Sequence, residues 1–234
     1  DVIICDHHNP GAALPQAYAI LNPKQNDCNY PFKHLCGCGV GFKLISGYYI
    51  KNDLNLNETY LFLDLLALGI VADIVPIIDE NRIYTYYGLK KINQNPNLGL
   101  ACLIKKLSRR NEIMSSDILF GIAPMINAAG RISHASNAVK LLIEKKTLNA
   151  EKHADLLFIN NQERKIIEKK IFDDALKKIN KNTLTTVIYS SEWHKGVIGI
   201  VASKLVEKHY RPTIIFSEKE GLMTGSARSI KGFD

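Results

Sequence analysis

The sequence predicts an α/β protein in which a long connector helix joins a helix-rich block with a parallel sheet to the start of a smaller α/β domain. Three patterns predict this class. Residues 2–5 form an apolar run without alternation, as in strands covered on both faces of a parallel sheet. Residues 149–179 contain neither glycine nor proline, as in a long helix. Residues 185–230 then follow the order strand, helix, strand, strand.

The first block combines short strands with apolar helices. A second strand is expected at residues 17–23, and the turn at residues 9–11 ends the first strand. Residues 72–78 lead into an amphipathic helix. The helices that we expect span residues 35–50, 59–68, 84–92, 98–107, 116–120 and 135–143.

The long helix separates this block from a second one. Ile167, Ile171, Ala175 and Ile179 recur every four residues between charged residues, and a helix over residues 149–179 would be about 45 Å long. Beyond it we expect a strand at 185–190, a helix at 197–210, a strand at 211–217, and a strand at 223–230 that a glycine turn interrupts. The predicted division of the chain is 1–146, 147–182 and 183–234.

The charge balance favours a polyanionic partner such as nucleic acid. The chain of 234 residues has 30 Lys and Arg against 23 Asp and Glu, which gives a net charge of +7. Many lysines lie around residues 165–181, where a solvated helix face and a binding patch explain them equally well. Trp193 could stack on a base, but core packing is the favoured interpretation.

Cysteine spacing and hydropathy indicate an intracellular setting. The five cysteines, at positions 5, 28, 36, 38 and 102, lack the paired spacing of a zinc site, and we expect them to be reduced and mostly buried. No apolar run approaches the ~18–20 residues of a membrane span, and no basic-then-apolar leader opens the chain. We therefore expect a cytoplasmic protein with no membrane partner.

Asp6, His7 and His8 stand together where the first strand ends. The carboxyl ends of strands are the edge at which open α/β sheets bind ligands. Imidazole is a common ligand for Mn and Zn, and a neighbouring carboxylate can bind the metal or fix the tautomer of the ring. The alternative is a polar loop that happens to contain two histidines, and the triplet alone does not decide between them.

Asp73 strengthens the metal hypothesis. It follows the apolar run 61–72, where a carboxylate is costly unless a cation or a donor meets it. Asp64 lies within the same run, but it could point outward from a helix, so Asp73 is the favoured ligand. A divalent metal held by a histidine and carboxylates indicates hydrolysis of a phosphate ester.

Two short strings supply candidate phosphate ligands. Asn127 and Arg131 stand among small residues, and the planar guanidinium of Arg131 suits phosphate oxygens, although a structural arginine is an equal alternative. Further along, Gly225 opens the backbone, and Ser226 and Arg228 offer donors for a phosphate cradle.

Taken together, these strings resemble a known family over nearly the whole chain. CDHHNPG, LALGIVADIVP, FGIAPMINAAGRI, NNQER, WHKGVIGIVASKL, RPTIIFS and GSARSI occur in that order. The chain is thereby similar to the DHH phosphoesterase superfamily, and within it to the RecJ family of bacterial single-strand-specific 5′ to 3′ exonucleases. The resemblance implies that residues 1–146 are the C-terminal part of a DHH metal-binding domain, 147–182 a connector helix, and 183–234 the N-terminal part of a DHH-associated domain.

The resemblance also implies roles for the candidate residues. His7 and Asp73 would bind Mn²⁺ or Mg²⁺ in a two-metal site, and His8 would act at the scissile phosphate with Asp6 as a further catalytic residue. Residues that would grip the phosphates of the substrate, including the 5′ terminal one, are Asn127, Arg131, Gly225, Ser226 and Arg228.

The implied function is hydrolysis of single-stranded DNA from the 5′ end to mononucleotides in DNA repair and recombination. The implied enzyme is a monomer whose partners are single-stranded DNA and, as candidates, a helicase and a single-strand-binding protein. One alternative is a DHH phosphoesterase of short oligonucleotides or cyclic dinucleotides, although such relatives usually carry a GGGH-like string where this chain has GSARS. The other is a non-catalytic DHH scaffold protein.

The chain departs from the family pattern at its start. The family carries two further motifs with aspartates upstream of DHH, and nothing precedes Asp1 here. We therefore expect a fragment that is inactive or nearly so, because His7 and Asp73 alone cannot hold two hard cations that each want roughly six ligands. The implied activity and the two-metal site belong to the complete protein.

Overall fold

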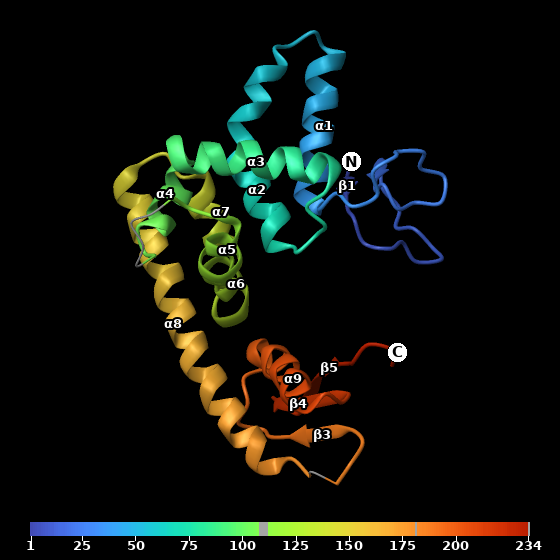
Figure 1. Cartoon of the computed structure of the whole chain (residues 1–234), viewed down its shortest axis with the longest axis vertical. Helices are drawn as coiled ribbons and strands as arrows, with labels where there is room; N and C mark the ends of the chain where they lie inside the picture. The colour runs from blue at the N-terminus through green and yellow to red at the C-terminus, as the bar shows by residue number, and fades with distance from the viewer. Residues whose placement is uncertain (108–111, 181, 234) are drawn as a thin grey trace. The chain divides into compact units, whose positions relative to one another are not determined.

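The protein is a helix-rich α/β chain with parallel strand pairing, which confirms the predicted class (Figure 1). The computed structural model describes residues 1–107, 112–180 and 182–233. Among these residues the α-helices are α1 (Gly37–Lys51), α2 (Leu63–Ala72), α3 (Asp79–Gln94), α4 (Leu98–Ile104), α5 (Ser115–Asp117), α6 (Ala123–Ile132), α7 (Ser136–Ile143), α8 (Thr147–Lys178) and α9 (Lys195–His209). The strands are β1 (Ile3–Cys5), β2 (Ala19–Leu21), β3 (Thr186–Tyr189), β4 (Thr213–Lys219) and β5 (Leu222–Arg228).

The chain forms two compact units. The first comprises residues 1–124 and 142–151, and the second comprises residues 125–141 and 152–234. The division into 1–146, 147–182 and 183–234 stays a prediction. Among the described residues, none of the helices has both the length and the apolar character needed to cross a membrane.

The sheet of the first unit consists of β1 and β2. The two strands pair in parallel, as predicted, and the structure places Ile4 opposite Ile20 and Cys5 opposite Leu21. The backbone N–H of Asp6 continues the ladder by donating to the carbonyl of Leu21 at 3.0 Å. The expected burial of β1 on both faces is wrong for the described residues, because Ile3 is half exposed and the sheet has only two strands.

The helices α1, α2 and α3 form the body of the first unit. The segment expected as one helix at 59–68 divides into a 3₁₀-helix at Leu56–Phe62 and α2. Six of the ten residues of α2 are buried and the other four are partly buried. Helix α3 packs closely on α2 because Gly88 carries no side chain. A Cβ at Gly88 would collide with the Leu63 carbonyl and the side chain of Ala67.

Asp64 points into the protein, and the expectation that it faces outward is wrong. Its side chain is fully buried, and its carboxylate accepts a hydrogen bond from the backbone N–H of Asn97 at 2.5 Å. Lys91 Nζ lies 3.6 Å from the same oxygen. The carboxylate therefore ties α2 to α3 and to the start of α4, which a purely apolar α2 could not do.

Residues 122–132, which the sequence presents as a motif, are helical. A π-helical turn at Ile118–Ile122 leads directly into α6, and the motif residues Asn127 and Arg131 lie four residues apart on it. Four residues is about one turn of α-helix, so the two polar side chains share one face of α6. The alanines between them, Ala128 and Ala129, are fully buried.

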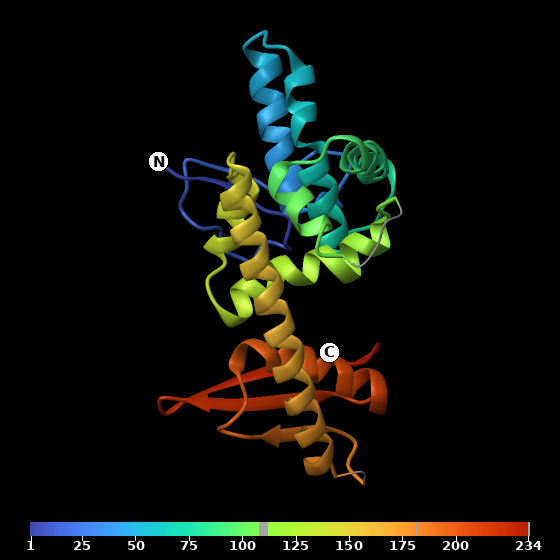
Figure 2. The same ribbon diagram turned by 90° about the vertical axis from the view of Figure 1, so that its left-hand side faces the viewer.

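The second unit is a three-stranded sheet covered by helices. Strand β3 pairs in parallel with β4, and β4 pairs antiparallel with β5. Figure 2 shows the C-terminal part of α8, in orange, crossing the strands of this sheet. The core consists of apolar residues from α8, β3, β4 and α9, namely Ile171, Ala175, Ile188, Val197, Ile198, Val201, Ala202, Leu205 and Ile215. The predicted long helix at 149–179 is confirmed, with bounds shifted by one or two residues.

The hairpin between β4 and β5 turns at Glu220 and Gly221, not at Gly225. Glu220 and Gly221 both have positive φ values, 55° and 74°, as in the two-residue turns that join antiparallel strands. Gly225 lies inside β5 opposite Phe216, so the predicted glycine turn within 223–230 is wrong. Its missing side chain leaves room for the Phe216 ring, since a Cβ at Gly225 would lie 2.6 Å from that ring.

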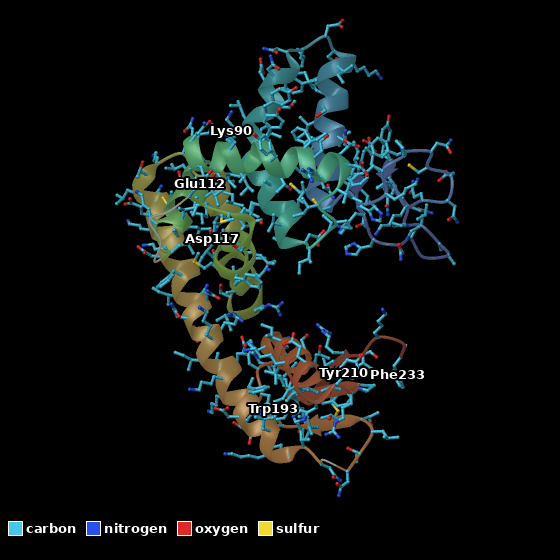
Figure 3. The ribbon with its side chains drawn as sticks, in the orientation of Figure 1. Lys90, Glu112, Asp117, Trp193, Tyr210 and Phe233 are labelled. Carbon is cyan, nitrogen blue, oxygen red and sulfur yellow. The ribbon has the colours of Figure 1, made fainter. Side chains whose placement is uncertain are left out.

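Trp193 belongs to the core of the second unit, which confirms the favoured interpretation. Figure 3 shows Trp193 beside the C-terminal part of α8. Its side chain is 5% exposed, and its indole N–H donates to Asp174 Oδ2 at 3.0 Å. Lys178 Nζ lies 5.0 Å from the ring centroid. A tryptophan enclosed in this way has no open face on which a base could stack.

The cysteines are free, as expected, but fewer are buried than expected. Cys36 and Cys102 are buried, Cys5 and Cys28 are half-buried, and Cys38 is exposed. The Sγ atom of Cys36 caps α1 by accepting from the N–H of Gly39 at 3.3 Å. In the described part of the chain no cysteine joins a cluster of metal-ligating residues.

Replacing Asp64 should test the buried tie between α2, α3 and α4. In Asp64→Ala the N–H of Asn97 and the ammonium of Lys91 lose their partner, and we expect the free energy of unfolding to fall by about 3 kcal/mol in urea denaturation. Asp64→Asn keeps an accepting oxygen and should cost less. The exposed Asp27→Ala is the control, with a change within about 0.5 kcal/mol. Equal stability of Asp64→Ala and Asp27→Ala would contradict this account.

Candidate functional site

The turn after β1 is organised by the Asp6 carboxylate. Asp6 Oδ1 accepts hydrogen bonds from the backbone N–H of His7 at 2.7 Å and of His8 at 3.2 Å, and it lies 2.7 Å from His8 Nδ1. The hydrogen bond with the His8 ring, followed by that from the His7 N–H, lowers the pKa of Asp6. Asp6 thus fixes both the turn and the orientation of the His8 ring, and leaves that ring 77% exposed.

The side chain of His7 contacts Asp73, which follows α2. His7 Nε2 lies 3.1 Å from Asp73 Oδ2, and the His7 side chain is largely buried while that of Asp73 is 41% exposed. The His7 ring lies against the start of α1, where a Cβ at Gly37 would lie 3.7 Å from His7 Cδ2. The rings of His7 and His8 are 4.5 Å apart, and one ligand atom from each of Asp6, His7 and His8 lies within 4.8 Å of the other two.

The geometry of His7 and Asp73 suits a divalent cation. Two ligands at right angles on a cation with bonds of about 2.1 Å stand about 3.0 Å apart, close to the observed separation of 3.1 Å between Nε2 and Oδ2. Imidazole nitrogen and carboxylate oxygen are also the donor types that Mn²⁺ takes. The pair would fill two of the roughly six ligand positions of such an ion and leave the others to water, substrate or further groups.

The backbone that carries Asp73 is strained. Asp73 caps the C-terminus of α2, and the next residue, Ile74, has φ of 57°, a left-handed conformation that a β-branched residue adopts at a cost of about 1–3 kcal/mol. The buried amide of Asn81 supports the segment by donating to the carbonyls of Pro76 at 2.9 Å and His34 at 2.7 Å. Sequence reasoning did not identify Asn81, because it lies between residues 72–78 and the helix predicted at 84–92, where nothing marks an asparagine as buried.

The second unit gathers Arg131, Ser226 and Arg228. Arg131 Nη1 donates to the carbonyl of Gly196 in the first turn of α9 at 3.1 Å. Arg228 Nη1 lies 3.3 Å from Ser226 Oγ, and its Nε lies 3.2 Å from Ser203 Oγ. Gly199 leaves the space for them, since a Cβ there would lie 3.0 Å from Ser226 Oγ.

Positive charge is concentrated around Arg131. Desolvation, followed by the nearby guanidinium groups of Arg164 and Arg228, lowers the pKa of Arg131, and only the more weakly felt Glu168 opposes this. Like charges held this close favour the binding of an anion that relieves their repulsion. Phosphate oxygens match the planar donor groups of arginine in geometry as well as in charge.

The two remaining candidates are placed differently. Asn127 is exposed on α6, one turn before Arg131. Gly225 alternates with Ser226 along β5, so it faces the opposite side of the strand from Ser226 and Arg228. A role of Gly225 in phosphate binding would therefore use its backbone alone.

Sequence reasoning missed three contributors to this cluster. Arg164 lies in the string NNQER, which contributes to the family resemblance but predicts no role for the arginine by itself. Ser203 and Gly199 lie one turn apart on α9, on the face that covers β5. The sequence pattern that could have identified them is the spacing of two small residues along an otherwise apolar helix. The same pattern is also expected where a helix only packs closely on a strand.

The chain is similar to known exonucleases. Residues 1–70 match the family model described as "DHH family, N-terminal domain". The chain is 42% identical to the single-stranded-DNA-specific exonuclease RecJ of Bacillus subtilis (strain 168), with all of this chain and 30% of that relative covered. Crystal structures of RecJ from Thermus thermophilus in complex with Mn²⁺ and with Mg²⁺ match 99% of this chain, with TM-scores of 0.88 and 0.84 and identities of 28% and 27%.

The relatives are longer than the chain. The chain covers 30% of the Bacillus subtilis protein, and 34% and 35% of the two crystallised chains. It thus spans about a third of the length of these three proteins.

The close contact between α9 and the backbone of Arg131 should require glycine at position 196. A Cβ in Gly196→Ala would collide with the backbone carbonyl of Arg131, and we expect overpacking to lower the free energy of unfolding by about 1–3 kcal/mol. Gly47→Ala on α1 is the control, because a Cβ there meets no atom within 4 Å and alanine in a helix gains up to about 1 kcal/mol. Urea denaturation measures both, and a stabilised Gly196→Ala would refute the close contact.

Proposed function

We propose that this chain, which belongs to the DHH family and is homologous over its whole length to RecJ exonucleases, provides metal-binding and phosphate-binding parts of a nuclease. The proposed reaction is hydrolysis of single-stranded DNA from the 5′ end to mononucleotides, in DNA repair and recombination. The single observation that carries the proposal is the distance of 3.1 Å between His7 Nε2 and Asp73 Oδ2. Two donors of the right chemistry, far apart in the sequence, meet at a separation that one divalent cation bridges.

His7 and Asp73 would hold Mn²⁺ or Mg²⁺, the ions of the two Thermus complexes. When bound, such ions lower the pKa of a water molecule and offset negative charge on the phosphate. The burial of His7 against the start of α1 keeps its ring in one orientation. The exposure of Asp73 leaves its second oxygen accessible for a further contact.

His8 would act directly on the phosphate with the help of Asp6. Because Asp6 accepts the hydrogen bond from Nδ1 of His8, the other nitrogen, Nε2, faces outward. When the ring carries a proton on both nitrogens, Nε2 can donate to a phosphate oxygen as negative charge develops. Asp6 favours a proton on Nδ1 of that ring. In this scheme Asp6 orients His8, which requires the carboxylate to stay ionised, in agreement with its lowered pKa.

Arg131, Ser226 and Arg228 would bind the phosphates of the strand, including the 5′ terminal one. Asn127, exposed on the same face of α6 as Arg131, and the backbone of Gly225 would contribute to the same task. Contacts with phosphates position a strand without reading its sequence. The proposed enzyme would therefore degrade single strands of any sequence.

The wider setting follows from the substrate. A nuclease restricted to single strands needs an activity that separates duplex DNA, so a helicase and a single-strand-binding protein are the proposed partners. We propose a monomer that works in the cytoplasm, where bacterial DNA is accessible. The net charge of +7 agrees with a polyanionic substrate.

Removing either proposed ligand should weaken metal binding. We expect His7→Ala and Asp73→Ala each to lower the affinity for Mn²⁺ by about 10-fold or more in isothermal titration calorimetry, because each removes one donor. The same changes should abolish Mn²⁺-dependent release of mononucleotides from a 5′-labelled single strand by the protein that carries this chain.

Two control variants separate the roles at this site. His134→Ala removes an exposed histidine of the second unit and should leave Mn²⁺ affinity unchanged. His8→Ala should also retain Mn²⁺ affinity but lose cleavage, because His8 is proposed to act on the phosphate. Unaltered Mn²⁺ affinity in both His7→Ala and Asp73→Ala would refute the metal assignment.

Replacing Arg131 or Arg228 by a neutral residue should lower the affinity for single-stranded DNA. We expect Arg131→Gln and Arg228→Gln each to reduce affinity for a short 5′-phosphorylated oligothymidylate by about 10-fold, and by less for the same strand with a 5′ hydroxyl. Fluorescence anisotropy without divalent metal measures both strands. The matched control is Arg82→Gln on α3 of the first unit. Equal losses for the two 5′ ends would remove the terminal phosphate from the proposal.

A further inference from the structure

A second basic surface lies between α8 and α9. It is an open hollow of about 520 Å³ whose wall carries four cations, Arg164, Lys165, Lys169 and Lys204, around one carboxylate, Glu168. All these residues belong to the second unit. Four positive charges and one negative charge leave a net +3 on the wall, which makes the hollow a site for an anion.

Glu168 fixes two of these cations in place. Its carboxylate is 8% exposed, lies 2.5 Å from Arg164 Nη1, and makes a close ion pair with Lys204 across from α8 to α9. Arg164 Nε also donates to Asn161 Oδ1 at 3.1 Å. A buried carboxylate that binds two cations holds both head groups rigidly, which lowers the entropic cost of presenting them to a ligand.

Lys165 and Lys169 are the uncompensated charges of the hollow. They lie four residues apart on α8, so they share one face of the helix, and both are exposed. Within residues 1–107, 112–180 and 182–233, neither takes part in an ion pair. Exposed lysines of this kind bind phosphates as mobile point charges and need no fixed geometry in the ligand.

The hollow adjoins the arginine cluster already described. Arg164 contributes to the wall of the hollow, and its charge also acts on Arg131, which is hydrogen-bonded to the start of α9. Arg228, Arg131, Arg164 and Lys204 therefore form a continuous series of cations in the second unit. A chain of regularly spaced phosphates is the ligand that such a series fits.

We propose that the hollow between α8 and α9 is a second phosphate subsite, which binds backbone phosphates of the single strand beyond the one held by Arg131, Ser226 and Arg228. The inference rests on the proposed function, and it divides the lysines of α8 into two sets. Lys165 and Lys169 line the hollow, whereas Lys170 and Lys177 are exposed on the same helix outside it. Lys181 lies outside the described residues.

The double variant Lys165→Gln/Lys169→Gln tests the subsite. Affinity is measured by fluorescence anisotropy, without divalent metal, for 5′-phosphorylated oligothymidylates from a dinucleotide to about 20 nucleotides. We expect unchanged affinity for the dinucleotide and a loss that grows with length and then levels off. For a long strand, the slope of log Kd against log salt should fall by about 1.4, which is about 0.7 for each lost phosphate contact.

Lys170→Gln/Lys177→Gln is the matched control, because it removes the same charge from the same helix outside the hollow. Both pairs of lysines are exposed, so the thermal transition by circular dichroism should stay that of the wild type. If the two double variants bind every strand length alike and with the same salt slope, the subsite is refuted.

A third variant, Arg131→Gln, separates this inference from the proposed function. Loss of binding in Arg131→Gln with full binding in Lys165→Gln/Lys169→Gln refutes the subsite and leaves the proposed function standing. A length-dependent loss in Lys165→Gln/Lys169→Gln supports the subsite even if Arg131→Gln binds normally, in which case the 5′ phosphate assignment fails. A wild-type chain that binds no single strand refutes both proposals.

Discussion

The meeting of His7 with Asp73 is the contact on which the first unit's chemistry depends. One residue follows a strand and the other ends a helix, and nothing between them in the sequence forces them together. Parallel pairing of β1 with β2 fixes where the first strand ends, and the burial of α2 fixes where Asp73 emerges. The site is therefore a consequence of core packing, because neither donor could hold its position on an exposed loop.

The supports of this contact are polar, and they are placed where the backbone is least regular. Asp6 satisfies the two N–H groups that β1 leaves unpaired at its end, and Asn81 binds two carbonyls around the segment that follows Asp73. That segment contains Ile74 in a left-handed conformation. A strained backbone conformation persists only where surrounding contacts hold it in place. The two hydrogen bonds that the buried Asn81 donates hold the segment that contains Ile74.

The sequence allowed most of the architecture to be predicted, because periodicity reports burial directly. The strands around residues 3–5 and 19–21, the long helix, and the order of the second unit followed from apolar patterns. The sequence also singled out His7 and Asp73, which the fold brings to 3.1 Å of each other. Asp64 was misjudged because helical periodicity cannot tell a solvated carboxylate from one paired with Asn97 and Lys91. Gly225 was misjudged because a glycine that makes room for the Phe216 ring has the same letter as one that makes a turn. Arg164 was given no role because Arg131, which lies far from it in the sequence, approaches it only in the folded chain.

The two units use the same arrangement of charges. In each, a carboxylate is used to orient a positively charged or proton-donating group: Asp6 holds His8, and Glu168 holds Arg164 and Lys204. The charged and donor groups that have no such carboxylate partner face solvent, where they can form hydrogen bonds and ion pairs with a ligand. A polyanion bound there relieves repulsion that folding alone leaves in place, as around Arg131. In the proposed sites, the charges available for binding are therefore those that the fold brings together and does not neutralise.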